Sequence, residues 1–207
     1  MDILTKKILI ICLLLNGCSV LEVNKNLFIQ SFIIPNKIVV NSAITDLPYA
    51  TSIFQYNNED EFLAVLGKER GGKLYWFGSK NIKLTTSNGT ITHSDGLKYD
   101  FIIKSYYFNK YDLKSKRSTI EFLDPPSGPL SIYYNYEEIE EGEIASLLTG
   151  DLYRYRLIKE SFNVPSILWK GENYYWLDSD NHVMSSSQEI SPYGDVINFK
   201  LIKKYSE

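Results

Sequence analysis

The 207-residue chain has very little cysteine and histidine, with two residues of each. Two cysteines are too few for a disulfide framework. The chain also lacks a basic surplus, since its formal net charge is −3 and its pI is about 5.5. Because phosphate backbones are bound by basic surfaces, we expect no nucleic-acid partner. No apolar run approaches the roughly 20 residues of a spanning helix, so we expect no multi-span membrane protein.

Aromatic residues, in contrast, are abundant. They make up 14% of the chain, with 16 tyrosines, 10 phenylalanines and 3 tryptophans. Aromatic side chains pack well on the pleated surface of a β-sheet. The hydrophobic content of 44% and the charged content of 23% are ordinary for a folded domain. The composition therefore indicates a folded, β-rich protein.

The first eighteen residues have the pattern of a lipoprotein signal. Lys6 and Lys7 form a short positive region, and eight apolar residues follow at positions 8–15. Such a run is typical of the core of a signal peptide. It ends in Leu15-Asn16-Gly17-Cys18, which resembles the bacterial lipobox, although Asn16 departs from the usual residue there. The resemblance implies cleavage before Cys18 and acylation of Cys18. The alternative is an ordinary secretory signal that is cut elsewhere.

Removal of the signal peptide, residues 1–17, leaves one domain, residues 18–207. Cys12 is lost with the signal and Cys18 carries lipid, so no thiol remains for catalysis or metal binding. We therefore expect no cofactor and no metal. Ser19, rather than an aspartate, follows the cysteine. By the same resemblance, this implies transport to the outer membrane, with the domain anchored by lipid and facing the periplasm.

Most of the mature chain shows the two-residue period of half-buried strands, most clearly in residues 101–108, 119–122, 130–136 and 197–201. Asn88-Gly89 predicts a hairpin with a type I′ turn. We expect about ten strands, joined by turns too short for parallel crossovers. This predicts an all-β fold, one large twisted antiparallel sheet curled into a barrel or folded into a sandwich. Residues 22–34 predict a short N-terminal helix, and residues 36–50 an irregular connector.

Two segments resemble each other within the chain. Residues 74–87 align without gaps with residues 174–187, and the identical positions include Tyr75/Tyr175, Trp76/Trp176 and Asn81/Asn181. This predicts two equivalent hairpins, in which both tryptophans occupy matching, mostly buried positions. The alternative is that two unrelated hairpins use the same common turn residues.

The polar residues form no recognisable catalytic group. His93 and His182 are the only histidines, and no G-x-S-x-G motif is present. His93, Ser94 and Asp95 are chain neighbours, which alternate faces on a strand and so make a poor relay. Two distant histidines without a free cysteine also make a poor zinc site. We expect structural or surface roles for both histidines, and no enzymatic activity.

Three further groups have functional alternatives. Five acidic residues surround Gly142, and we expect them in a solvated turn, with calcium binding or catalysis as the alternative: Glu137, Glu138, Glu140, Glu141 and Glu143. We expect cross-strand pairing for Arg154 and Arg156, with binding of an anionic sugar or of an acidic patch as the alternative. For Trp76 and Trp176 the alternative to burial is stacking on a carbohydrate.

Three motifs lie between residues 74 and 101: Tyr75-Trp76-Phe77-Gly78-Ser79, Leu84-Thr85-Thr86-Ser87-Asn88-Gly89 and Thr92-His93-Ser94-Asp95-Gly96-Leu97. They resemble the YjbF lipoprotein family, which includes the capsule lipoproteins of group 4 capsule loci. The resemblance continues in residues 47–50, 173–178 and 185–188. Asp95 departs from the family pattern, and residues 124–129 have no counterpart in it.

The resemblance implies a non-enzymatic accessory protein for capsule or exopolysaccharide export. Its partners would be a large outer-membrane β-barrel protein, a periplasmic protein of the same locus and, as a further contact, the polysaccharide. The family has no established catalytic residues, so only Cys18 is carried over. Two alternatives stay open: a polysaccharide-modifying enzyme, such as a lyase or deacetylase, and a carrier that binds lipid or polysaccharide.

Overall fold

The computed structural model describes residues 44, 46–57, 59, 61–104, 116–123, 128–145 and 152–204. The chain divides into two compact units, Met1–Asn36 and Lys37–Glu207, and all described residues belong to the second. The signal peptide, Cys18 and the helix expected at residues 22–34 lie outside the described residues.

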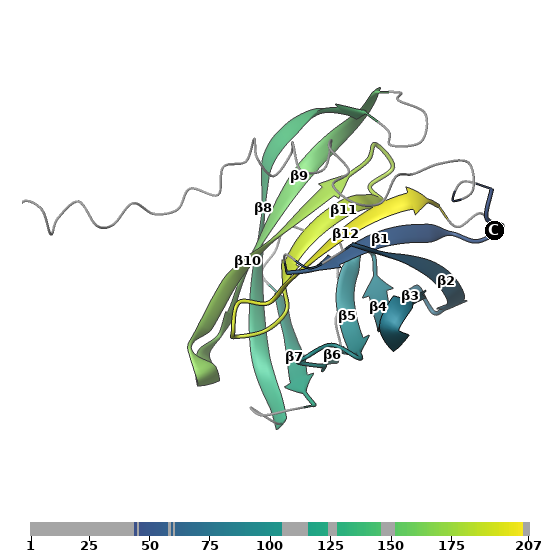
Figure 1. The fold of residues 1–207 in the computed structure, drawn as a ribbon. Coiled ribbons are helices and arrows are strands. Elements are labelled where there is room, and N and C mark those ends of the chain that lie inside the picture. Colours follow the sequence, from purple (N-terminus) through teal and green to yellow (C-terminus); the bar gives the residue numbers. More distant parts are fainter. Residues whose placement is uncertain are drawn as a thin grey trace, which may run out of the picture. The chain divides into compact units, whose positions relative to one another are not determined.

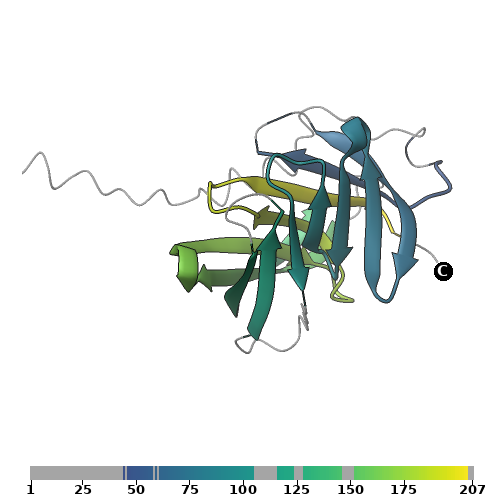
Figure 2. The ribbon, with the colours of Figure 1, turned by 90° about the horizontal axis from the view of Figure 1, so that it is seen from below.

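Twelve antiparallel strands form a closed barrel in which each strand pairs with its sequence neighbours and the last pairs with the first (Figure 1). They are β1 (Thr51–Tyr56), β2 (Phe62–Arg70), β3 (Lys73–Gly78), β4 (Lys83–Ser87), β5 (Thr90–Asp95), β6 (Phe101–Lys104), β7 (Lys116–Phe122), β8 (Gly128–Ala145), β9 (Leu152–Val164), β10 (Trp169–Leu177), β11 (Val183–Glu189) and β12 (Val196–Lys203). Short 3₁₀ turns, η1 (Ser79–Asn81) and η2 (Pro165–Ile167), follow β3 and β9. Figure 2 shows the same barrel from below.

The all-β prediction is confirmed. Of the two expected architectures, barrel and sandwich, the structure has the closed barrel. The expected number of about ten strands is too low. The alternation is weakest in β1, where nearly every residue is buried on both faces of the sheet. A strand buried on both faces carries no alternation of polar and apolar residues, and alternation is the signal by which strands are recognised in a sequence.

The β4–β5 hairpin confirms the turn predicted from Asn88-Gly89. Both residues have positive φ, 50° and 79°, as a type I′ turn requires. Gly89 also has a packing role, because a Cβ atom placed on it would lie 2.4 Å from the Cβ of Val183 in β11. The hairpin therefore approaches the opposite side of the barrel closely at this point.

The inward side chains of the strands fill the barrel. One aromatic group joins Phe54, Trp76 and Phe199, with ring centroids 5.1–6.2 Å apart. The indole Nε1 of Trp76 donates a hydrogen bond to Thr86 Oγ1 at 2.9 Å, so the buried indole has its polar atom satisfied. A second group packs the Trp169 ring 4.7 Å from Phe162 and 5.9 Å from Phe122.

A polar clamp crosses the lumen between β11 and β5. The Gln188 Oε1 atom accepts the backbone N–H of Ile91 at 2.9 Å, and its Nε2 donates to the Gly89 carbonyl at 2.9 Å. Nε2 also donates to Ser186 Oγ at 2.7 Å. A side chain that is 2% exposed therefore fixes the start of β5 to the far wall. Beside it lies a cavity of about 20 Å³, roughly the space of one water molecule.

The close approach at Gly89 predicts a large effect of Gly89→Ala on stability. Left-handed backbone costs an L-residue about 1–2 kcal/mol, and the overlap with Val183 adds about 1–3 kcal/mol. Gly71→Ala is the matched control, because Gly71 has a φ of 60° but no atom within 4 Å of an added Cβ. Urea unfolding of both variants measures the difference. Equal losses at the two positions would show that the hairpin does not pack against β11.

Candidate functional site

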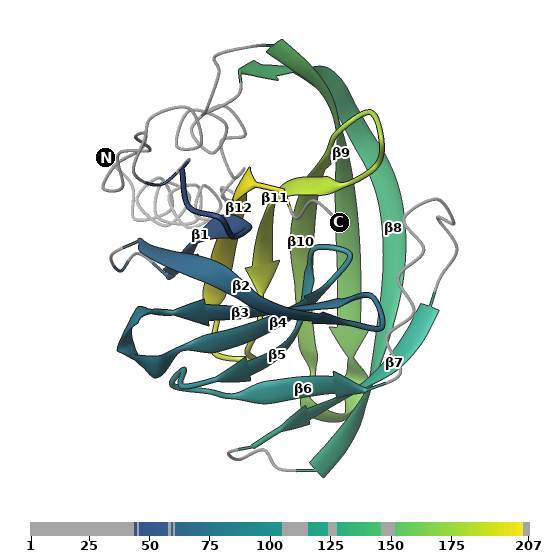
Figure 3. The ribbon, with the colours of Figure 1, turned by 90° about the vertical axis from the view of Figure 1, so that its right-hand side faces the viewer.

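The strands β8 and β9 extend past their neighbours as a two-stranded ribbon (Figure 3). The pairing of β7 with β8 ends at Tyr134, and the pairing of β10 with β9 ends at Arg156. Beyond these points, Gly142 to Ala145 pair with Tyr155 to Leu152. Among the described residues, no third strand pairs with this part of β8 or β9. The ribbon thus presents side chains outside the filled lumen.

A cleft of about 570 Å³ lies between this ribbon and the β10–β11 turn. The ribbon contributes Glu141, Gly142, Glu143, Arg154, Tyr155 and Arg156, and the turn contributes Asp178, Ser179 and Asn181. Arg156 crosses it, because one guanidinium nitrogen lies 2.9 Å from Glu138 Oε2 and the other donates to the Asn181 side chain. The cleft is therefore polar, with charges of both signs, and gathers most of the charged residues singled out in the sequence.

The acidic residues near Gly142 lie in a strand, so the expected turn is wrong, whereas the expected exposure to solvent is confirmed for all but the half-buried Glu140. Glu137, Glu138, Glu140, Glu141 and Glu143 all belong to β8. The strand accommodates them because β9 places basic residues opposite: Glu137 faces Lys159, Glu141 faces Arg156 and Glu143 faces Arg154. The expectation that Arg154 and Arg156 share a face and pair across strands is confirmed for the ion pair of Arg156 with Glu138.

Asp178 organises the turn that forms the other side of the cleft. Its Oδ1 accepts the backbone N–H groups of Asp180 and His182 at 3.0 and 2.8 Å. Its Oδ2 accepts a hydrogen bond from Lys204 Nζ at 2.6 Å. Burial alone would raise the pKa of Asp178, but the hydrogen bonds from Lys204 and His182 outweigh it and lower that pKa. The carboxylate is thus held charged by groups of its own chain.

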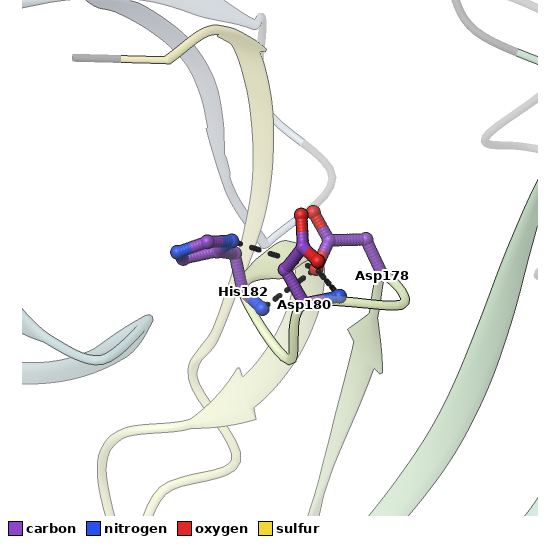
Figure 4. Close-up of side chains that lie close together, drawn as sticks. All are labelled: Asp178, Asp180 and His182. Carbon is purple, nitrogen blue, oxygen red and sulfur yellow. Dashed lines mark hydrogen bonds and ion pairs between the residues drawn. The ribbon is translucent and has the colours of Figure 1, made fainter. Parts of the chain in front are cut away.

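Asp178, Asp180 and His182 also form a potential metal-ligand group, drawn in Figure 4. Their ligand atoms lie within 4.8 Å of one another. This group was not predicted, because only the two histidines were weighed as metal ligands, although the Asp-x-Asp-x-His spacing is visible in the sequence. However, Lys204 and two backbone N–H groups already occupy the oxygens of Asp178. A cation would have to displace an ammonium group, so these contacts favour a structural turn.

His93 and its neighbours are arranged as the strand alternation predicts. His93 faces Ile102 of β6 across the sheet. The Ser94 hydroxyl donates to Asp100 at 2.9 Å, while Asp95 pairs with Lys83 at 2.8 Å. Neither group is directed at the imidazole, so the three chain neighbours form no relay. His182 lies in the β10–β11 turn with its side chain 63% exposed.

The alignment of residues 74–87 with residues 174–187 correctly predicts two similar turns, but it does not predict the positions of Trp76 and Trp176 relative to the lumen. Asn81 and Asn181 have the same positive φ, 61° and 64°. Both tryptophans are buried, but Trp76 belongs to the interior core cluster, whereas Trp176 does not, and its neighbour Tyr175 points inward instead. The prediction of equivalent positions is therefore wrong. The hairpins share their turn chemistry and present opposite faces to the lumen.

A buried carboxylate inside the barrel was also missed. Glu160 is fully buried, and its Oε1 accepts hydrogen bonds from Asn173 Nδ2 at 2.6 Å and from the Tyr175 hydroxyl at 3.1 Å. Burial and the nearby Glu160 charge raise the pKa of Tyr175 well above its usual value. Glu160 occupies an inward position between Ile158 and Phe162, and this polar interruption of an apolar face was the available signal.

Comparison with known proteins supports the fold. No protein-family model matches the chain, and no curated protein sequence matches it. The chain is similar to the crystal structure of the hypothetical lipoprotein YmcC from Escherichia coli K12, with a TM-score of 0.71 and 15% sequence identity. The match covers 86% of this chain and 95% of YmcC. In the part of the chain that the structure describes, no helix is both long and apolar enough to cross a membrane.

The hydrogen bonds to Asp178 predict a pH-dependent contribution to stability. A lowered folded-state pKa stabilises the fold above the unfolded pKa of about 3.9, and this contribution is lost as pH falls through the folded pKa. Asp178→Asn should therefore flatten the fall of unfolding free energy between about pH 5 and pH 2. Asp180→Asn, in the same turn but exposed, is the control. Denaturant titrations at several pH values test this, and a wild-type slope in Asp178→Asn would refute it.

Proposed function

We propose that the protein is a lipid-anchored, non-enzymatic accessory protein for capsule or exopolysaccharide export at the outer membrane. The observation that carries the anchor is the sequence Leu15-Asn16-Gly17-Cys18 after a short apolar run. The polysaccharide role is supported by the resemblance to the YjbF family alone, while the shared fold with the hypothetical lipoprotein YmcC agrees with the lipid anchor. The protein acts there by holding a partner, with Cys18 as its functional residue.

The proposed anchor is strong enough to hold the domain without a spanning segment. Each buried CH₂ of an acyl chain contributes about 0.8 kcal/mol, and stable anchoring needs more than one chain. The acylated Cys18 of the lipobox pattern would carry three. The domain that follows then faces the periplasm as a folded body close to the membrane surface.

The barrel interior favours a docking role over a carrier role. A lipid carrier needs an apolar lumen of several hundred Å³. Here the lumen holds packed aromatic rings, the Gln188 clamp and the buried Glu160, with a cavity of about 20 Å³ beside them. Two charged residues of the outer cleft are held by groups of the same chain: Arg156 pairs with Glu138, and Asp178 pairs with Lys204. These contacts support a structural body more than a catalytic one.

The end of the β8–β9 ribbon suits the contact with the export partner. It projects beyond the barrel, and Leu152 and Tyr153 are 69% and 45% exposed there. Exposed aromatic and apolar side chains are the usual centre of a protein interface. We propose that this ribbon contacts the outer-membrane β-barrel protein of the export locus.

The lipid anchor is tested by Cys18→Ser, with Cys12→Ser as the matched control in the same segment. Cys18→Ser should abolish labelling by radioactive palmitate and remove the protein from washed outer membranes. Cys12→Ser should leave both unchanged, because Cys12 lies within the apolar run. Palmitate still incorporated into Cys18→Ser would contradict the proposal.

The accessory role predicts which variants change the amount of surface polysaccharide. His93→Ala, His182→Ala and the double change Glu137→Ala/Glu138→Ala should leave it near normal. Leu152→Ser/Tyr153→Ser should reduce it at unchanged protein abundance, because solvent-exposed side chains contribute little to stability. Surface polymer is quantified alongside immunoblots.

Loss of polymer, or polymer of altered composition, from a stable histidine variant at normal abundance would favour an enzyme. Removing a catalytic group typically costs several orders of magnitude in rate while the fold stays intact. A normal polymer level in the ribbon variant would place the partner contact elsewhere.

A further inference from the structure

A buried row of side chains crosses the outer surface of the barrel. The row has one residue on each of the neighbouring strands β9, β10, β11, β12 and β1, and each lies opposite the next in the strand register. In this order the residues are Leu157, Trp176, Ser185, Lys200 and Ile53. Their chain neighbours Ile158, Tyr175, Phe199 and Phe54 belong to the interior core cluster. Because side chains alternate along a strand, this row points outward. Yet Leu157, Trp176, Ser185 and Ile53 are only 2%, 5%, 7% and 5% exposed.

Lys200, the charged residue of this row, is half-buried. Burial lowers the pKa of Lys200 to about 8, and the nearby charge of Glu61 only partly offsets this. Ile202, two residues further along β12, is 6% exposed and also lies outside the interior cluster. A solvent-facing barrel wall would leave these side chains open to water. The outer face of β9–β12 and β1 is therefore a covered face.

The chain itself offers a covering segment next to this face. Residues 37–43 read Lys-Ile-Val-Val-Asn-Ser-Ala, and they directly precede Ile44, where the described part of the chain begins. The segment leads into Leu47, whose carbonyl accepts a hydrogen bond from Lys203 Nζ of β12 at 2.6 Å. The chain thus enters the barrel beside Ile202, at one end of the covered face.

The length of the segment matches the width of the face. Neighbouring strands lie about 4.8 Å apart, so the span from β12 to β9 is about 14 Å. Six residues reach at most about 20 Å when extended. A chain that leaves Ile44 can therefore place residues 38–40 over β11 and β10, with alternate apolar side chains directed at the face. Burying them against Trp176 removes apolar surface from water on both sides of the contact.

We propose that residues 37–43 dock on this face, with side chains from the apolar run 38–40 packed against Trp176 and its row. The barrel then holds the membrane-proximal end of its own chain. A further consequence rests on the proposed function: if Cys18 carries the lipid, residues 19–36 are the linker between the lipid anchor and the docked segment. The docking itself is independent of lipid and is tested on unlipidated protein.

Cysteine cross-linking tests the docking. The mature Cys18→Ser chain contains no cysteine, because Cys12 is lost with the signal. Ile38→Cys, Val39→Cys and Val40→Cys are each combined with Ser185→Cys in the buried row. The control partner is Thr119→Cys, which points outward from β7, between the inward residues Ser118 and Ile120. At least one pair with position 185 should close intramolecularly about tenfold or more faster than its control pair, as docking raises effective concentration.

Equal rates for positions 185 and 119, or cross-links mainly between two molecules, would overturn the docking.

Amine labelling gives a second readout that introduces no cysteine. The triple change Ile38→Ser/Val39→Ser/Val40→Ser should increase acetylation of Lys200 several-fold, measured by mass spectrometry. Lys83, whose side chain is 53% exposed, is the internal control and should not change. An unchanged Lys200 in a folded triple variant would also overturn the proposal.

Discussion

The barrel depends on the clamp that Gln188 makes across its lumen. One amide side chain satisfies a backbone donor and a backbone acceptor of the β4–β5 hairpin, and Gly89 allows the hairpin to come close enough for both bonds. The same region contains Glu160, which binds Asn173 and Tyr175. A buried polar network of this kind is costly when it is incomplete, so it selects one packing of the lumen. The interior is consequently a packed core.

The outer surface carries two features that the strand pairing explains. The longest strands continue as a ribbon in which basic residues of β9 lie opposite acidic residues of β8. The turn at Asp178 faces this ribbon and is held by Lys204, next to the last strand. A body with a filled interior and a projecting ribbon is suited to contact with another protein. This physical argument and the family resemblance support the accessory role that we propose.

Much of the fold was predictable because local signals agreed with the final structure. The Asn88-Gly89 turn and the alternating segments were recognised because their causes are local. The alternation is weaker in β1, since both of its faces are buried. Trp76 and Trp176 show a different limit: identical neighbours specify the same turn, but the face that meets the lumen depends on the pairing of the whole barrel. The acidic run was misread for a similar reason, because its compensating arginines lie on β9.

Co-purification from detergent-solubilised outer membranes tests the central claim, an accessory protein that acts through a partner, most directly. The lipidated, affinity-tagged protein is isolated from cells that produce surface polysaccharide, and co-eluting proteins are identified by mass spectrometry. We predict recovery of an outer-membrane β-barrel protein encoded in a polysaccharide secretion locus, with the isolated polymer unchanged after incubation with the purified protein. Recovery of the protein alone, together with shortening or chemical modification of the polymer in that incubation, would contradict this claim.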